Sequence, residues 1–229
     1  MVIASVADWH HISSVLPCLH PRADAAYDAW MATTPGPSSL PFTGDDEADA
    51  FIAHDPLALL IGFALDQQVT VQKAFSGPLE LQRRIGHLDA ARIAAMDSDE
   101  LSEVFRRPPA LHRFPGAMAT RVRDLAAAIS EQYGGDASRV WREASDGPDL
   151  ERRLLELPGV GAMKAKSLIA VLGKRYRVQP PGWEAVAPTW PTLGDVDSAE
   201  ALASYQASKR AQKAAARAGA GKAAKPRKT

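Results

Sequence analysis

The chain has 229 residues, 46% of them hydrophobic, which is enough for one sizeable domain or two small ones with a substantial core. Its one cysteine, Cys18, excludes a disulfide framework and any iron–sulfur cluster or four-cysteine metal site built by this chain alone. No apolar run approaches the roughly 20 residues of a membrane helix, and the N-terminus lacks the basic and apolar regions of a secretory signal. We therefore expect a protein of the reducing cytoplasm without membrane contact.

The net charge of zero hides two oppositely charged parts of the chain. Residues 205–229 hold eight lysine or arginine residues and no acid, which leaves 19 basic against 27 acidic residues in 1–204. An acidic body with a basic tail indicates a polyanionic partner for the tail, such as nucleic acid. A tail that only solubilises the terminus is the alternative.

Residues 1–44 differ in composition from the rest, and the stretch TTPGPSSLPFTGDD is typical of a linker. We expect a disordered extension over 1–44, whose first 30 residues are untranslated if Met31 is the start. Structural zinc sites pair their ligands at two-to-five-residue spacings, so we interpret the histidines and cysteine of this segment as a chance cluster and not as a metal site. These residues are His10, His11, Cys18 and His20.

From Asp45 onward the hydrophobic pattern is helical, which predicts an all-α domain over 45–204 followed by a basic tail over 205–229. In HDPLALLIGFALDQQ, Asp55 is placed to cap a buried helix that has Pro56 at its first position. Asp197 or Ser198 is placed to cap the last helix. Other helices are predicted near 77–86, 89–95, 98–106, 114–133, 148–157 and 162–172. The only strand candidate is Tyr176–Gln179.

The string LPGVG at residues 157–161 separates two segments whose apolar faces are both helical. Two such faces joined by a glycine-rich turn predict an α-hairpin, in which Gly159 and Gly161 allow positive φ or close backbone approach. The second helix then begins with free N–H groups at Gly161, Ala162 and Met163, where a phosphate can bind.

Lys164 and Lys166 stand in the first turns of this second helix. Cations are disfavoured at a helix N-terminus, so their presence favours an anion in front of them. An ordinary packing hairpin is the alternative.

The string LPGVG with a basic helix start resembles the helix-hairpin-helix of the DNA glycosylase superfamily that includes endonuclease III and the 3-methyladenine glycosylases. Gln67-Gln68-Val69-Thr70 is similar to the Gln-Gln-apolar-Ser/Thr string that ends an apolar helix in alkylbase glycosylases, although Asp66 replaces the small residue usual before it. The resemblance covers about residues 45–187. It looks closest to a small actinobacterial-type branch without an iron–sulfur cluster.

The resemblance implies that the hairpin amides hold a DNA phosphate and that the glutamines face the opened duplex. The DNA-binding residues that it predicts are Gln67, Gln68, Gly159, Gly161, Ala162, Met163, Lys164 and Lys166. It also implies a K⁺ or Na⁺ ion held by the main-chain carbonyls of Leu155, Leu157 and Val160.

Two departures from the family pattern concern catalysis. Met163 stands where bifunctional members place a lysine that forms a Schiff base, and Lys164 is rotated from that position by about 100° on a helix. The resemblance therefore implies a glycosylase without lyase activity.

Pro180-Pro181-Gly182 stands where the family has its essential aspartate, which stabilises positive charge on the sugar. The remaining candidate acids are Glu184, Asp195, Asp197 and Asp66. Helix caps at Asp195 and Asp197, a surface acid at Glu184 and a polar helix end at Asp66 are the structural alternatives.

Trp183, Trp190 and Tyr176 lie near the same loop. A glycosylase holds its flipped base between aromatic or apolar surfaces, but these rings are equally suited to fill a core beneath a Pro-rich loop.

The sequence thus predicts a monomeric, all-α, helix-hairpin-helix base excision repair protein of the nucleoid. It would bind double-stranded DNA and hydrolyse the N-glycosidic bond of a damaged base. One alternative is a non-catalytic DNA-binding protein that has lost the aspartate, and another is a hairpin module of a larger nucleoprotein assembly.

Overall fold

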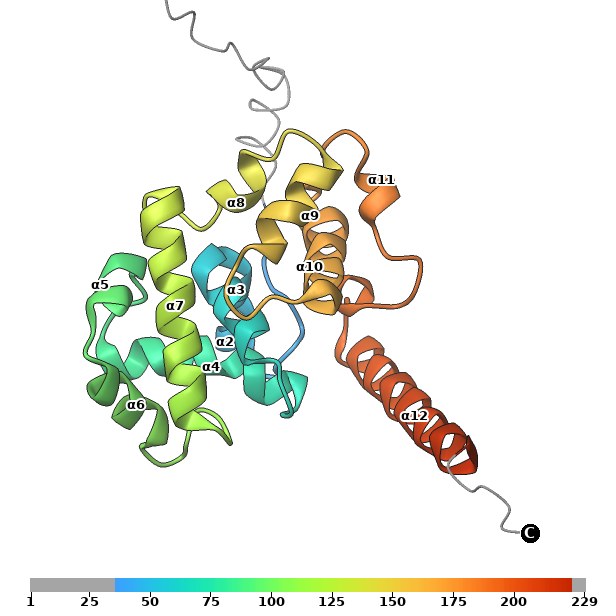
Figure 1. Ribbon diagram of the computed structural model, residues 1–229, viewed down its shortest axis with the longest axis horizontal. Coiled ribbons are helices and arrows are strands. Elements are labelled where there is room, and N and C mark those ends of the chain that lie inside the picture. Colours follow the sequence, from blue (N-terminus) through green and yellow to red (C-terminus); the bar gives the residue numbers. More distant parts are fainter. Residues whose placement is uncertain (1–35, 224–229) are drawn as a thin grey trace, which may run out of the picture.

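The computed structural model describes residues 36–223, and all regular secondary structure in this part is helical, which confirms the all-α class. The helices are α2 (Asp46–His54), α3 (Pro56–Leu65), α4 (Val71–Ile85), α5 (Ala90–Ala95), α6 (Ser98–Arg106), α7 (Pro115–Tyr133), α8 (Arg139–Arg142), α9 (Gly147–Leu155), α10 (Ala162–Arg175), α11 (Trp183–Val186) and α12 (Ala199–Ala223), with a short 3-10 helix, η1 (Leu193–Asp195), before α12. Figure 1 shows α12 projecting from the body formed by the other helices.

Helix α3 is the centre of the fold and packs against α2, α4 and α7 (Figure 1). As predicted, Asp55 caps it by accepting the N–H of Ala58 at 2.9 Å, and Pro56 opens it. Every residue from Leu57 to Leu65 is buried, because the helix is apolar on all sides. The helix therefore delivers the polar residues that follow it to a fixed place on the surface.

The stretch 36–44 belongs to the domain, so the expectation of a linker is wrong for these residues. Leu40 and Phe42 are fully buried, and the ring of Phe42 packs edge-on against Phe75 of α4, with centroids 5.1 Å apart. One carboxylate oxygen of Asp49 accepts the N–H groups of Phe42 and Thr43 at 3.1 and 2.8 Å. Two apolar side chains thus outweigh the Pro- and Gly-rich composition around them.

The four candidate metal ligands of the N-terminal segment, and Met31, lie outside the described residues. Their interpretation as a chance cluster stays a prediction. These residues are His10, His11, Cys18 and His20.

Helix α4 begins earlier than the predicted 77–86, because Thr70 caps it by accepting the N–H of Lys73 at 3.2 Å. Pro78 lies inside this helix. Arg84, near its end, donates to the carbonyls of Val104, Arg107 and Pro109. Helices α5 and α6 pack on the long helix α7, which Gly134 ends in the left-handed conformation.

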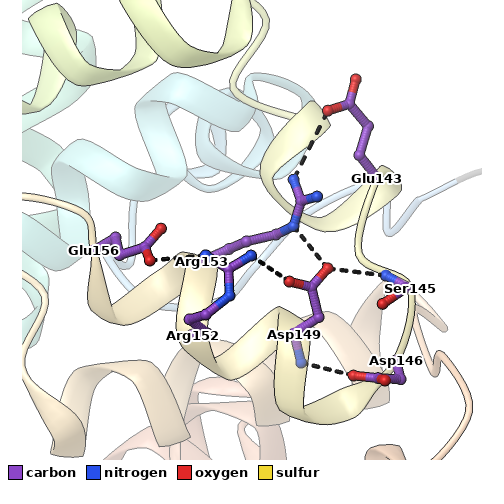
Figure 2. A network of polar contacts seen from close by, with 7 residues as sticks. All are labelled: Glu143, Ser145, Asp146, Asp149, Arg152, Arg153 and Glu156. Carbon is purple, nitrogen blue, oxygen red and sulfur yellow. Dashed lines mark hydrogen bonds and ion pairs between the residues drawn. The ribbon is translucent and has the colours of Figure 1, made fainter. Parts of the chain in front are cut away.

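Helices α9 and α10 form the predicted hairpin, and a polar network fixes the first of them (Figure 2). The carboxylate of Asp149 accepts the N–H of Ser145 at 3.0 Å and the guanidinium groups of Arg152 and Arg153 at 2.5 and 2.9 Å. Asp146 caps the helix through the N–H of Asp149 at 2.7 Å. This network sets the position of the helix that enters the glycine-rich turn.

The predicted strand Tyr176–Gln179 is wrong, because these residues close α10 and pack back on the core. The hydroxyl of Tyr176 donates to the carbonyl of Ala53 at 2.9 Å. Trp183 donates to Ile169 O at 3.2 Å, and its ring covers Gly173, where a Cβ atom would meet it at 2.2 Å. These two aromatic residues are therefore partly buried and pack against the core, while Trp190 is exposed.

Ser198, one of the two predicted caps, begins α12 by accepting the N–H of Ala201 at 3.1 Å. Leu202 is the buried anchor of this helix. In the described part of the chain no single helix is long and apolar enough to cross a membrane, although α2 and α3 pass that test together as a bent pair.

Candidate functional site

The two glycines of the hairpin turn have different roles. Gly159 has φ of +85°, and a Cβ atom there would lie 2.6 Å from Cδ of Arg121, so both conformation and contact require glycine. Gly161 has φ of −92°, and nothing in the protein lies within 4 Å of where its Cβ would be. The expectation that Gly161 allows a positive φ or a close backbone approach is therefore wrong. Its missing side chain leaves open space beside the start of α10.

The start of α10 offers unbonded backbone donors to that open space. Gly161 is the N-cap residue, and no side chain caps the helix. Its carbonyl accepts the N–H groups of Lys164 and Ala165, both at 2.9 Å, whereas the first N–H groups of a helix have no partner within it. The donors at Ala162 and Met163 therefore stand at the positive end of the helix dipole, where an anion is favoured.

The loop after α3 carries Gln67 and Gln68 in an unusual backbone shape. Gln68 is exposed and has φ of +58°, a left-handed conformation that residues other than glycine rarely adopt. The carbonyl of Gln67 accepts a hydrogen bond from Nε2 of His112 at 3.0 Å. Strain of this kind persists where the surroundings fix it, and it gathers at functional sites.

His112, which no sequence motif predicted, fixes this loop by hydrogen bonds at both of its ring nitrogens. The imidazole is 1% exposed, and its Nδ1 accepts the N–H of Phe114 at 3.1 Å while its Nε2 donates to Gln67. This pairing requires a neutral ring with the proton on Nε2. Burial lowers the pKa of His112, which favours the same neutral form. No local pattern in the sequence marks this residue, because its partner lies 45 positions away.

The glutamine loop and the hairpin turn, predicted separately from the sequence, line one open cleft of about 550 Å³. Arg121 of α7 connects the two, because its guanidinium donates to Oε1 of Gln67 and its aliphatic part lies against Gly159. The residues lining the cleft are Gln67, Arg121, Gly159, Val160, Gly161, Ala162, Met163 and Lys164.

Lys164 bridges the two halves of the cleft from within. Its Nζ donates to the carbonyl of Ala64 near the end of α3 and to that of Gly159 in the turn, both at 3.1 Å. Burial lowers the pKa of Lys164 to about 8; nearby Asp66 opposes this shift and Arg121 adds to it. The side chain of Lys164 therefore joins the end of α3 to the hairpin turn. The sequence had led us to expect an ammonium that reaches out to an anion.

Lys166 does not line this cleft, and its contact with DNA stays a prediction. Its Nζ donates to the carbonyl of Val186 and pairs with the carboxylate of Glu151, both at 2.8 Å. The lysine thus holds α11 and α9 to α10.

None of the four candidate acids lines this cleft, and three of them are not adjacent in sequence to the residues that do. Asp195 caps η1 by accepting the N–H of Thr192 at 2.9 Å, and its other oxygen pairs with Lys174 at 2.5 Å. Burial raises the pKa of Asp195, but the hydrogen bonds from Lys174 and Thr192 outweigh it and leave the pKa below its ordinary value. Asp197 and Glu184 are exposed, Glu184 in the first turn of α11.

Asp66 is the candidate acid that the structure brings next to the cleft. It ends α3, precedes Gln67 directly, and is near enough to Lys164 to affect the pKa of that lysine. Its side chain is half-buried and makes a polar interaction within the protein.

The carbonyl-bound ion stays a prediction. The Leu157 carbonyl accepts the N–H of Val160 at 3.0 Å, and the ammonium of Lys164 already places a positive charge on the same turn. A second cation held by Leu155, Leu157 and Val160 would be repelled by that ammonium, so the fit is poor. Among residues 36–223, no group of three or more His, Cys, Asp or Glu residues is placed to hold a metal ion.

A larger cleft of about 710 Å³ lies between α4, α5 and α6, away from both motifs. The guanidinium of Arg84, one of its basic residues, donates hydrogen bonds to the carboxylate of Glu80 and to carbonyls around the end of α6. Its lining mixes arginine with Glu100 and Glu103, so no single ligand charge is favoured.

Comparison of the chain with protein-family models, with curated proteins and with solved structures finds no match. The family resemblance therefore rests on the two sequence motifs and on their meeting in one cleft.

Proposed function

We propose that this protein binds double-stranded DNA and acts as a monofunctional DNA glycosylase in base excision repair. One observation carries the proposal: the Gln67 loop and the start of α10 form one cleft, Arg121 and Lys164 hold them together, and His112 fixes the loop. A monomer associated with the nucleoid in the cytoplasm remains part of this proposal.

The cleft suits DNA through its donors. The N–H groups at the start of α10 and the absent side chain of Gly161 would accommodate a backbone phosphate. Oε1 of Gln67 accepts a hydrogen bond from Arg121, so the amide nitrogen of that glutamine can donate to a base or sugar. Gln68 is exposed beside it.

Asp66 is the residue that we assign to the chemical step. The bond between sugar C1′ and the base breaks with its electron pair leaving on the base. Water adds to C1′, and the proton that it loses is taken up by the departing base. A carboxylate beside the sugar stabilises the positive charge that develops there. Asp66 lies next to the glutamine loop, whereas Asp195 is committed to a helix cap and a lysine.

Lyase activity is not expected. Met163, at the position of the family's nucleophilic lysine, is 68% exposed and has no nucleophilic group. Lys164 has a pKa of about 8 and donates to two carbonyls, so at neutral pH it is mainly an ammonium ion, which is not a nucleophile.

The test is single-turnover base release from duplexes carrying uracil, hypoxanthine, alkylated purines or 8-oxoguanine, with products resolved with and without alkali. We expect release from one lesion class, with strand cleavage only after alkali. D66N should slow release by about 10²- to 10³-fold and retain DNA affinity, because it removes a charge needed only in the transition state. D197N and E184Q are matched controls and should release the base normally.

A non-catalytic DNA-binding protein is the second candidate, and the loop at the expected aspartate position favours it. Pro181 O accepts the N–H of Gly147 at 2.8 Å, and a Cβ on Gly147 would lie 2.5 Å from Gly182 O. This backbone contact with α9 fixes the segment without an acid. Tight binding of all duplexes with no release from any lesion would establish this candidate. Equal affinity for damaged and undamaged DNA would favour a general hairpin module.

A further inference from the structure

A second cleft, of about 300 Å³, lies between the glutamine loop and α12. From the loop and the start of α4 it is lined by Asp66, Gln68, Val69, Thr70 and Val71, and from α12 by Gln206, Lys209 and Arg210. Its wall is fixed, because Nε2 of Gln206 donates to Oε1 of Gln72 at 2.8 Å across 134 residues of sequence. The cleft is therefore part of the folded domain, although α12 continues to Ala223 (Figure 1).

The two clefts meet at consecutive residues. Gln67 lines the cleft of the hairpin turn, and Gln68 lines the cleft of α12. The positive φ of Gln68 turns the chain between them. A DNA strand that crosses the tip of this loop would leave one cleft and enter the other.

The α12 wall brings two exposed cations to this cleft. Lys209 stands with its Nζ 5.0 Å from the ring centroid of Tyr205, and Arg210 follows it. Asp66 places one carboxylate on the opposite wall, where Lys164 balances part of its charge. A phosphate would therefore bind on the α12 side.

We propose that the second cleft binds the DNA phosphate backbone on the far side of Gln68 from the hairpin, with Lys209 and Arg210 as its contacts. This inference rests on the proposed DNA binding and adds a second, built site for the same ligand. A guanidinium donates two parallel hydrogen bonds to a phosphate, and an ammonium supplies a compact charge. The start of α12 is then a fixed part of the DNA interface, distinct from the rest of the basic tail.

The experiment measures the affinity of the full chain for an undamaged duplex across a range of KCl concentrations. K209Q/R210Q should lower the affinity about tenfold at 0.15 M salt and reduce the slope of log K against log salt by about 2, because two phosphate contacts are lost. K213Q/R217Q removes the same charge from later positions of α12 and should have a clearly smaller effect. Equal losses in the two variants would overturn the proposal in favour of unspecific attraction by the tail.

A second variant separates a fixed wall from a loose tail without changing any charge. Q72A removes the partner of Gln206 and should weaken binding about threefold, a loss typical of one hydrogen bond. Thermal unfolding checks that the domain remains folded. An unchanged affinity in Q72A would contradict the fixed cleft.

The proposed function and this inference fail in different ways. If wild type binds no duplex at all, both are wrong. If R121Q weakens binding while K209Q/R210Q does not, the hairpin cleft stands and the second cleft is overturned.

Discussion

His112 is the single residue on which the shape of the glutamine loop most depends. Its two ring nitrogens connect the backbone of Gln67 to that of Phe114, and the ring is almost fully buried. A side chain that cannot both donate and accept at these positions leaves a buried backbone group without a partner, which costs about 1–3 kcal/mol.

Replacing His112 with phenylalanine should therefore lower the free energy of unfolding by about 2 kcal/mol and weaken DNA binding. Burial lowers the folded-state pKa of His112 below the unfolded value of 6.5. The unfolded state then binds more protons as the pH falls below 6.5, so wild type loses stability there. Urea unfolding at pH 7.5 and pH 5 measures this. H112F should lose less stability than wild type between the two, and an identical loss would show that His112 does not titrate as described.

Helix α9 is the element whose position decides where the hairpin turn lies. The network of Figure 2 holds it at its solvent face, with Asp149 at the centre and a side chain that is only 16% exposed. Burial raises the pKa of Asp149, but hydrogen bonds from Ser145, Arg152 and Arg153 outweigh it and lower the pKa below its ordinary value.

D149N should lower the free energy of unfolding by about 2 kcal/mol, because it leaves Arg152 and Arg153 without their shared carboxylate. E156Q is the matched control: it removes only an exposed partner of Arg152 and should cost less than about 0.5 kcal/mol. Because the folded pKa of Asp149 is depressed, its contribution is present above pH 3.8 and is lost as the pH falls through the folded value. Chemical unfolding at pH 7 and pH 3 tests this, and equal effects of the two variants would contradict it.

At the scale of the whole molecule, local signals in the sequence predicted several helix boundaries. Asp55-Pro56 located the start of α3, and LPGVG located the hairpin. Each of these rests on cap or turn chemistry that neighbouring residues decide.

Contacts between distant residues could not be predicted from one sequence. The hydrogen bond from Lys164 to Ala64 spans 100 positions of sequence, and the hydrogen bond from Gln206 to Gln72 spans 134. The burial of Leu40 and Phe42 was likewise missed, because composition describes the surroundings of a side chain and not its partner in the core. The candidate site was thus predicted as two motifs, while the residues that join them emerged only from the fold.

The measurement that tests the DNA-binding cleft most directly compares G161A with wild type for duplex affinity and for stability. The φ of Gly161 suits alanine and the added Cβ meets no protein atom, so unfolding should change by less than about 1 kcal/mol. The same Cβ would stand in front of the α10 donors, so we expect the affinity to fall at least about tenfold, in line with the loss of a charge-assisted hydrogen bond.

G159A provides the contrast, because its positive φ and its contact with Arg121 predict a loss of stability instead. A stable G161A that loses DNA affinity is the result that this account predicts. A stable G161A that binds duplex DNA as tightly as wild type would contradict a phosphate at the start of α10 and, with it, the proposed function.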